Sequence, residues 1–253
     1  MRVFAVSDIH VDYEVNARWI QGLSKSDYRD DVLILAGDVS HELAALASCI
    51  GALVARFRQV LFVPGNHDVW VLRDAPSKTS FDKFRDVAET VAASGASMEP
   101  FVEGNLAIVP LLGWYDYSFG EPSDALREIW MDYHACRWPQ GVEAGAVAAR
   151  FASLNDRIAP PVAAQVITFS HFLPRLDLIP AFVPRQHRVL DPVLGSVLLE
   201  RQLRRFNSTI HVYGHSHINR SIRINGVMYV NNAFGYPAES GIAAKRLLCV
   251  HES

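Results

Sequence analysis

Aspartate, histidine and asparagine side chains gather in five short polar clusters, and each cluster directly follows an apolar run typical of a buried strand. The clusters are Ser7-Asp8-Ile9-His10, Gly37-Asp38, Gly65-Asn66-His67-Asp68, Ser170-His171 and Gly214-His215-Ser216-His217. Carboxylate, imidazole and amide donors without a thiolate suit first-row ions such as manganese, iron, zinc or cobalt. The donors are too many for one tetrahedral ion, so the set favours two ions that share a carboxylate.

The spacing inside the clusters predicts their backbone conformation. Asp8 and His10 are two positions apart, as are His215 and His217, and on an extended backbone such pairs point to the same side. Glycines at positions 37, 65 and 214 permit positive φ or close backbone approach where the chain leaves the sheet. We therefore expect both pairs to lie on extended backbone with their side chains directed inward.

The elements that must position these clusters alternate between strands and helices. Strands are predicted at 2–6, 32–36, 60–63, 106–112, 166–169 and 209–213, and helices at 15–23, 42–57, 81–93, 144–158 and 193–206. The last helix is expected to begin with Asp191 as its cap and Pro192 in its first turn. Asn225-Gly226 predicts a tight hairpin between strands at 221–224 and 227–230. An order that begins as βαβ and ends as a β-meander predicts one layered α/β domain. The carboxyl ends of its strands would share the edge that binds ligands.

Two stretches do not fit this alternation. Residues 114–139 contain seven aromatic side chains: Trp114, Tyr115, Tyr117, Phe119, Trp130, Tyr133 and Trp138. They predict an insertion over one end of the sheet, either a packed subdomain core or a lid or cap over about 114–160. Residues 172–188 hold three prolines with Arg175, Arg185 and Arg188, which indicates an ordered, irregular loop. One of these arginines is a candidate for binding a substrate phosphate, with a solvated face as the alternative.

The series of clusters resembles the signature of the calcineurin-like metallophosphoesterase superfamily, in the family's order and across residues 8 to 217. The resemblance implies a four-layer α/β/β/α sandwich, formed by a single domain over residues 1–253 with the aromatic-rich insertion. It also implies two metal ions, divalent or of mixed valence. Asp8, His10, Asp38 and His217 would hold one ion, and Asp38, as the bridge, with Asn66, His171 and His215 would hold the other.

The same resemblance implies hydrolysis of phosphate mono- or diesters by in-line attack of a hydroxide that bridges the ions. His67 would be catalytic without being a metal ligand, because it would stabilise the transition state or protonate the leaving oxygen. Asp68 is expected to orient the His67 ring, and a cap on the following turn is the alternative. Two divalent ions together with the negative carboxylates of Asp8 and Asp38 have a net charge of about +2. A bound phosphate ester and one hydroxide would nearly neutralise this charge.

The composition limits the partners and the compartment. The 253 residues include 24 Lys and Arg against 27 Asp and Glu, a formal net charge of −3, which provides no general attraction to nucleic acid or an acidic membrane. The first residues lack a secretory pattern, and no apolar run approaches about 18 residues. Cys49, Cys136 and Cys249 form no metal-binding spacing and are expected to be buried thiols. We expect a cytoplasmic enzyme that acts on a small phosphorylated molecule or nucleotide.

Two other functions remain open from the sequence: a non-catalytic metal-binding scaffold of the same fold, and a metal-dependent nuclease. A scaffold would be expected to lose a ligand or the histidine of the Gly-Asn-His-Asp block, whereas every expected position is occupied. A nuclease is disfavoured by the absence of a basic signal. Phosphate-binding glycine loops and a nucleophile elbow are absent, which disfavours hydride transfer and serine hydrolysis. The remaining histidines are expected to be structural or at the surface: His41, His134, His187, His211 and His251.

Overall fold

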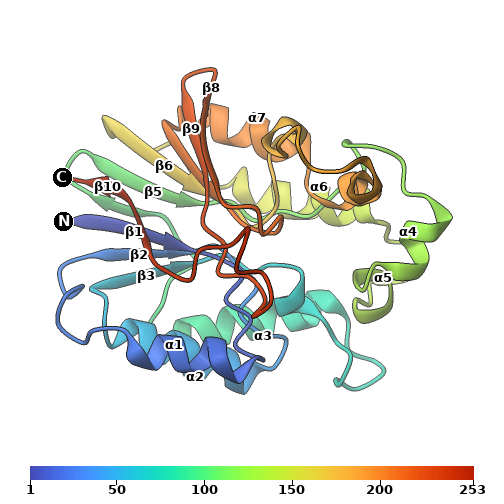
Figure 1. The fold of residues 1–253 in the computed structure, drawn as a ribbon, viewed down its shortest axis with the longest axis horizontal. Helices are drawn as coiled ribbons and strands as arrows, with labels where there is room; N and C mark the ends of the chain where they lie inside the picture. Colours follow the sequence, from blue (N-terminus) through green and yellow to red (C-terminus); the bar gives the residue numbers. More distant parts are fainter.

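The computed structural model describes all 253 residues, and its strands form two sheets that pack face to face (Figure 1). The first sheet has the order β10-β1-β2-β3, with β1 at Arg2–Val6, β2 at Val32–Leu35, β3 at Gln59–Phe62 and β10 at Leu248–Glu252. The second has the order β4-β5-β6-β7-β9-β8, with β4 at Phe101–Glu103, β5 at Leu106–Pro110, β6 at Gln165–Phe169, β7 at Ile210–Tyr213, β8 at Arg220–Ile224 and β9 at Val227–Asn231. The inner strands of each sheet are parallel, and β10, β4 and β8 pair antiparallel at the edges.

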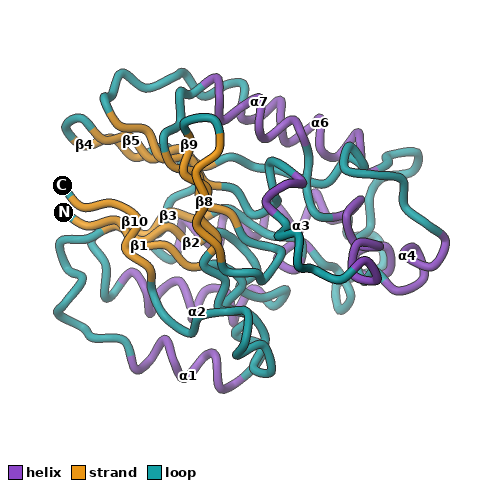
Figure 2. The backbone as a smooth tube through the Cα atoms, turned by 45° about the horizontal axis from the view of Figure 1, so that its top comes forward, coloured by secondary structure: helices purple, strands orange, loops and turns teal.

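Helices cover the outer face of each sheet, as the view in Figure 2 also shows. The first sheet carries α1 at Glu14–Gly22, α2 at Leu43–Val54 and α3 at Ser80–Ala93, and the second carries α6 at Ala144–Asn155 and α7 at Val197–Arg205. Two short helices, α4 at Asp124–Ile129 and α5 at Asp132–Ala135, lie beyond one end of the sheets. The expected four-layer α/β/β/α sandwich is confirmed. None of the helices combines the length and the apolar character needed to cross a membrane.

Three apolar cores hold the four layers together. In β1, Val3 and Ala5 face the second sheet, whereas Phe4 and Val6 face the helices. Side chains alternate between the two faces of a strand, so one continuous apolar run supplies two cores. Complete burial of one such side chain stabilises the fold by about 1.5–3 kcal/mol. This packing explains why the strands are apolar up to the residue where the polar clusters begin.

The predicted strands and helices are present, but the predicted start of the last helix is wrong. Asp191 and Pro192 lie in a 3-10 helix, Arg185–Val193, and α7 begins after Ser196, whose hydroxyl accepts the N–H of Leu198. Residue 195 forms a bridge with Leu173, and a Cβ added at Gly195 would lie 1.9 Å from the Leu173 carbonyl oxygen. This close approach holds Gly195 and Ser196 against Leu173, and Ser196 is extended, so the helix starts later than the local sequence suggests.

The C-terminal region confirms one prediction and corrects another. Asn225 and Gly226 have φ values of 48° and 86°, as the predicted tight hairpin requires. The predicted β-meander is wrong, because β9 lies between β7 and β8 and runs parallel to β7. The chain then crosses to the first sheet, where β10 pairs with β1 and brings the two termini together (Figure 1).

The aromatic segment 114–139 contributes to the core between the second sheet and its helices. Trp114 and Tyr115 are 2% exposed and contact the ring of Phe172. Residues 144–155 form α6, which belongs to the helix layer and packs against α7. Of the cysteines, Cys49 is buried but Cys249 is exposed on the edge strand β10, so the expectation of three buried thiols is wrong.

Candidate metal centre

The five polar clusters meet where β1, β2, β3, β6 and β7 end. Their donor atoms form three overlapping groups, and within each group all atoms lie within 4.8 Å of one another. The groups are Asp8 with His10 and His217, His10 with Asp38 and His67, and Asp38 with His171 and His215. Asp38 therefore belongs to two groups, one with His10 and the other with His171 and His215, as a shared carboxylate would.

The first set of donors contains Asp8, His10 and His217. His217 Nε2 lies 3.2 Å from Asp8 Oδ1 and 3.2 Å from His10 Nε2. Ligands bound to one first-row ion at about 2.0–2.2 Å stand roughly 3–3.5 Å apart, so these distances fit a common ion. All three side chains are nearly inaccessible to solvent.

The second set contains Asp38, Asn66, His171 and His215. His171 Nε2 lies 3.4 Å from Asp38 Oδ2, 3.1 Å from Asn66 Oδ1 and 3.0 Å from His215 Nδ1. An amide oxygen, a carboxylate oxygen and two ring nitrogens thus converge at spacings that again fit one ion. The seven predicted metal ligands are all brought together.

The ring nitrogens that face away from the two sets have different partners. His217 Nδ1 lies 2.6 Å from Glu239 Oε2, so a carboxylate supports the first set. His171 Nδ1 lies 3.0 Å from the Ala36 carbonyl oxygen, and His215 Nε2 lies 3.1 Å from that of Val193. Each partner accepts a hydrogen bond from one ring nitrogen and leaves the other nitrogen free for a metal.

The backbone of the ligand residues is left-handed, so the prediction of extended backbone is wrong. The φ values of five non-glycine residues lie between 44° and 67°: Asp8, His10, Asp38, His215 and His217. This conformation costs on the order of 1 kcal/mol or more per residue and persists only where neighbouring structure enforces it. Here Asp8 N–H donates to the Gly37 carbonyl oxygen, and His10 N–H donates to that of Asp38. The loops after β1 and β2 therefore hold each other in place.

The prediction of close backbone approach at the glycines is confirmed. A Cβ added at Gly65 would lie 2.1 Å from Asp38 Oδ1, and one at Gly214 would lie 2.8 Å from Asp8 Oδ2. Any side chain at either position would displace a proposed ligand. The glycines therefore make room for the two carboxylates.

Burial controls the protonation of the centre. It lowers the pKa of His10 to about 3 and also lowers the pKa of His171, which leaves neutral rings of the kind that bind metals. Burial, together with Asp8 and Asp68, raises the pKa of Asp38 well above its ordinary value. Burial would lower the pKa of His217, but Asp8 and Glu239 raise it to about 10. A cation between the sets would relieve the cost of an ionised Asp38.

His67 lies beside both donor sets. Its Nε2 is 3.8 Å from Asp38 Oδ2 and 3.5 Å from the Tyr236 hydroxyl. The ring stacks on Trp70 with 3.7 Å between ring centroids, and burial and the neighbouring His10 lower its pKa well below the ordinary value. A neutral imidazole is thus held against the residue that the two sets share.

Asp68 does not take the role predicted for it as the partner of the His67 ring. Its Oδ1 accepts the N–H groups of Val39 and Ser40, and its Oδ2 accepts those of Asp38 and Gly65. These four bonds are 2.8–3.0 Å long and occupy both oxygens. Asp68 therefore positions the loop that carries Asp38.

Three residues around the centre were missed by the sequence analysis: Asp132, Tyr236 and Glu239. The Tyr236 ring stacks on His10 at 4.5 Å, and Glu239 accepts the Tyr236 N–H as well as contacting His217. Asp132 Oδ1 accepts a hydrogen from Asn66 Nδ2 at 2.8 Å. None of the three follows a buried strand directly within a recognised motif, so no local signal distinguishes them from other polar residues.

None of the other candidates belongs to a donor group. Arg175 pairs with Asp177 and Glu200, and Arg188 pairs with Asp191, which weakens the hypothesis that either binds a substrate phosphate. Arg185 is exposed. His211 is buried and contacts the hydroxyls of Thr168 and Ser170, as expected of a structural histidine.

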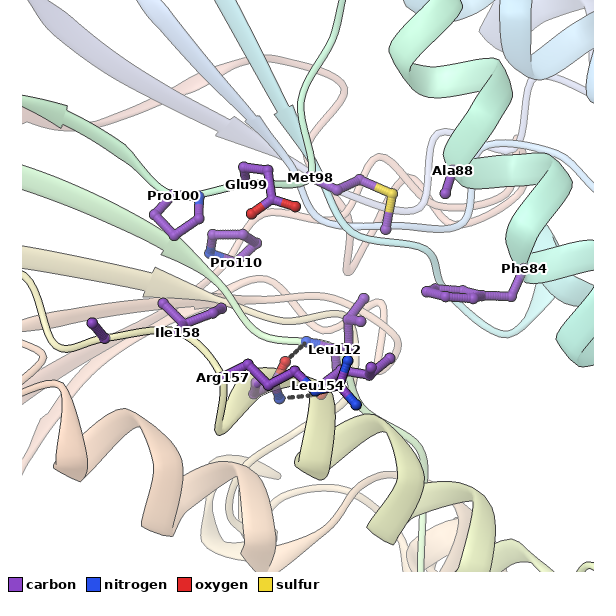
Figure 3. Close-up of a pocket in the computed structure, with 12 residues that line it drawn as sticks. Phe84, Ala88, Met98, Glu99, Pro100, Pro110, Leu112, Leu154, Arg157 and Ile158 are labelled. Atoms are coloured by element: carbon purple, nitrogen blue, oxygen red, sulfur yellow. Dashed lines mark hydrogen bonds between the residues drawn. The ribbon is translucent and has the colours of Figure 1, made fainter.

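Two grooves differ in their relation to the centre. The larger, about 550 Å³, lies between α3 and α6, where Phe84 and Ala88 face Leu154 and Ile158, and no proposed ligand lines it (Figure 3). The other, about 440 Å³, is lined by Ser216 and Glu239 together with the loop 179–194, which contributes mainly apolar side chains and also His187, Arg188 and Asp191. Only the second groove borders the centre, so it is the one that can hold the rest of a substrate.

Comparisons with known proteins found a matching family, a similar sequence and a similar fold. The sequence model of the family described as calcineurin-like phosphoesterase matches residues 1–219. The acyl-carrier-protein phosphodiesterase PptH of Mycobacterium tuberculosis is 26% identical over 265 residues, which cover 94% of this chain and 78% of that protein. The crystal structure of that organism's phosphopantetheinyl hydrolase PptH superposes with a TM-score of 0.75 at 23% identity, covering 94% of this chain and 90% of the other.

Proposed function

Because the chain belongs to the calcineurin-like phosphoesterase family and is a metal-dependent phosphoric ester hydrolase, we propose that it cleaves phosphodiesters at a centre of two metal ions. The observation that carries this proposal is the place of Asp38, whose carboxylate is grouped both with His10 of the first donor set and with His171 and His215 of the second. A carboxylate shared in this way is what two ions about 3.5–4 Å apart require.

The donor atoms fit two ions of the manganese, iron, zinc or cobalt type. Asp8, His10, Asp38 and His217 would hold one, and Asp38, Asn66, His171 and His215 would hold the other. When bound, two such ions would supply a hydroxide nucleophile at neutral pH and stabilise the charge that develops on the phosphoryl oxygens. The protein itself contributes the buried, neutral rings of His10 and His171, whereas His217 and Asp38, whose pKa values are raised, would release protons when ions bind.

His67 is the residue that we assign to the leaving group. It stacks on Trp70, which limits the rotation of the ring, and its Nε2 faces the shared carboxylate of Asp38. From there its Nε2–H can donate a hydrogen bond to an oxygen of the ester, and the negative charge of a bound ester would raise the pKa of the ring and favour transfer of a proton. Asp68 acts on this step only indirectly, because it holds the backbone of Asp38.

The substrate that we propose is a phosphodiester that joins a phosphopantetheinyl arm to a carrier protein. Support comes from the similarity to PptH and from the mostly apolar groove beside Glu239, which can take an organic arm. A small phosphorylated molecule or nucleotide is the alternative substrate. The exposed free thiol of Cys249 suits a reducing compartment, and we propose a cytoplasmic location.

The test compares metal-free and reloaded protein. Metal-free protein is expected to be inactive on bis-p-nitrophenyl phosphate, and Mn²⁺, Co²⁺ or Fe²⁺ should restore turnover. Activity that survives a chelator would refute the metal mechanism. Metal-loaded protein without activity on any ester would indicate a non-catalytic metal-binding scaffold. To decide between the substrates, mass spectrometry would compare the release of phosphopantetheine from a carrier protein with the hydrolysis of cyclic nucleotides.

A further inference from the structure

A buried carboxylate outside both donor sets contacts one of the proposed ligands. Asp132, the first residue of α5 in the aromatic segment 114–139, is 2% exposed. Its Oδ1 accepts hydrogens from Asn66 Nδ2 at 2.8 Å and from Trp70 Nε1 at 2.7 Å, and its Oδ2 accepts one from Trp130 Nε1 at 2.9 Å. These donors are a neutral amide and two neutral indoles, and the Tyr115 hydroxyl is a further neutral group that favours the ionised carboxyl.

Burying a carboxylate among neutral donors is costly. An asparagine would avoid the buried charge, but its amide carries two hydrogens of its own. Its oxygen could accept the hydrogens of Asn66 and Trp70 only if its NH₂ group faced the Trp130 N–H, where two donors would meet without an acceptor. The three donors thus require a group that only accepts.

An acceptor at this place also determines how the Asn66 amide is oriented. Because Asn66 donates through Nδ2 to Asp132, its Oδ1 must face the other way, where it lies 3.1 Å from His171 Nε2. A flipped amide would place two oxygen atoms about 2.8 Å apart and turn an NH₂ group toward the second donor set. An NH₂ group cannot bind a cation.

We propose that Asp132 is a positioning residue that locks the Asn66 amide with its oxygen toward the second donor set. Through this contact the aromatic segment 114–139 controls occupancy of the second metal position. The proposal rests on the assignment of Asn66 as a ligand in the proposed function. Trp130 strengthens the link, because its indole lies edge-on to the His215 ring at 5.7 Å.

The variant that tests the proposal is Asp132→Asn, measured by calorimetric titration of metal-free protein with Mn²⁺. We expect the affinity for one of two ions to fall about tenfold or more, with the other unchanged. Electron paramagnetic resonance should show the signal of a coupled ion pair in the wild-type protein and that of a single ion in the variant at the same Mn²⁺ concentration. Excess Mn²⁺ should restore most of the lost kcat.

Two controls separate positioning from a merely structural role. Asp124→Asn removes a carboxylate from the exposed face of the same segment and should leave both affinities unchanged. In an Asn66→Ala background, Asp132→Asn should have no further effect on ion binding.

A measurement on the wild-type protein avoids dependence on the folding of the variant. In nitrogen-15 spectra the side-chain NH₂ of Asn66 should exchange slowly with water. A freely rotating, fast-exchanging amide would overturn the proposal, as would Asp132→Asn protein that binds both ions normally or loses both equally. Wild-type protein that binds fewer than two ions would contradict the proposed function and this inference together.

Discussion

The two donor sets of the centre differ in what supports them. In the first set the outer nitrogen of His217 meets a carboxylate, Glu239, whereas in the second the outer nitrogens of His171 and His215 meet backbone carbonyl groups. A carboxylate adds negative charge and makes the ring a stronger base. A carbonyl fixes the tautomer without adding charge. The two metal positions are therefore chemically unequal, although their donor atoms are similar.

The difference also follows the architecture. Glu239 lies in the segment between β9 and β10, where the chain crosses from one sheet to the other. The second set is supported by Ala36 at the end of β2, by Val193 and, through Asn66, by Asp132 of the aromatic segment. The first set should therefore bind its ion more tightly, and the second should depend on packing around α5.

The largest effect is expected for Asp38→Asn, because this carboxylate lies between the sets. The variant should lose tight binding of both ions, and kcat/KM on a diester should fall on the order of a thousandfold, since several kcal/mol of charge stabilisation are removed. Metal content by mass spectrometry and initial rates measure the two losses. Retention of one tightly bound ion would show that Asp38 belongs to one set only.

His67→Gln should reduce activity without changing either affinity. Loss of a general acid costs roughly a hundredfold to ten-thousandfold on an alkyl diester, whose leaving oxygen needs a proton. The loss should be much smaller on bis-p-nitrophenyl phosphate, because nitrophenolate leaves without one. Equal losses on the two substrates would argue against the leaving-group role, and weaker metal binding would make His67 a ligand.

Glu239→Gln tests the unequal support directly. The amide can still accept the hydrogen of His217 Nδ1 but lacks the charge, so affinity for the first ion should fall about tenfold while the second is unchanged. The pKa of His217 should also move down from its raised value, as proton NMR of metal-free protein can show. Glu89→Gln on the exposed side of α3 is the matched control. If Glu239→Gln instead weakened binding of the second ion, Glu239 would not be the support of the first donor set.

The smallest effect concerns His211, a buried histidine of β7 that contacts no proposed ligand. Burial lowers its folded-state pKa to about 3, against an ordinary value near 6.5, so the unfolded chain binds a proton that the folded protein does not. Stability should therefore fall as the pH decreases from about 6.5 toward 3. Between pH 6.5 and 5 the loss attributable to His211 is roughly 1.5 kcal/mol. Urea unfolding of metal-free wild type and His211→Gln should show a smaller loss in the variant, and parallel losses would contradict this assignment.

Much of the centre was predictable because its signals are local. Asp8, Asp38 and His171 each follow an apolar strand directly, and parallel strands bring such positions to one edge. The backbone was not predictable in the same way, since residues spaced two apart, such as Asp8 and His10, proved to be left-handed. That conformation depends on hydrogen bonds between separate loops, which no single segment encodes.

The start of α7 and the role of Asp68 show the same limit. Asp191 and Pro192 form a good local start signal, but the contact between Gly195 and Leu173 delays the helix. Asp68 is adjacent to His67 in sequence, yet its carboxylate meets the backbone of the loop after β2. In both cases a distant backbone group competes successfully with the nearest partner.

By itself, the amino-acid sequence determined which donors exist and that they stand at strand ends, because strand periodicity and polar breaks are properties of short segments. Only the tertiary structure decided which donors meet and what supports each one. His10 and His217 are 207 positions apart, and Asn66 and Asp132 are 66 apart. Such pairs form only when the packed layers bring their loops together, so their geometry is a property of the whole fold.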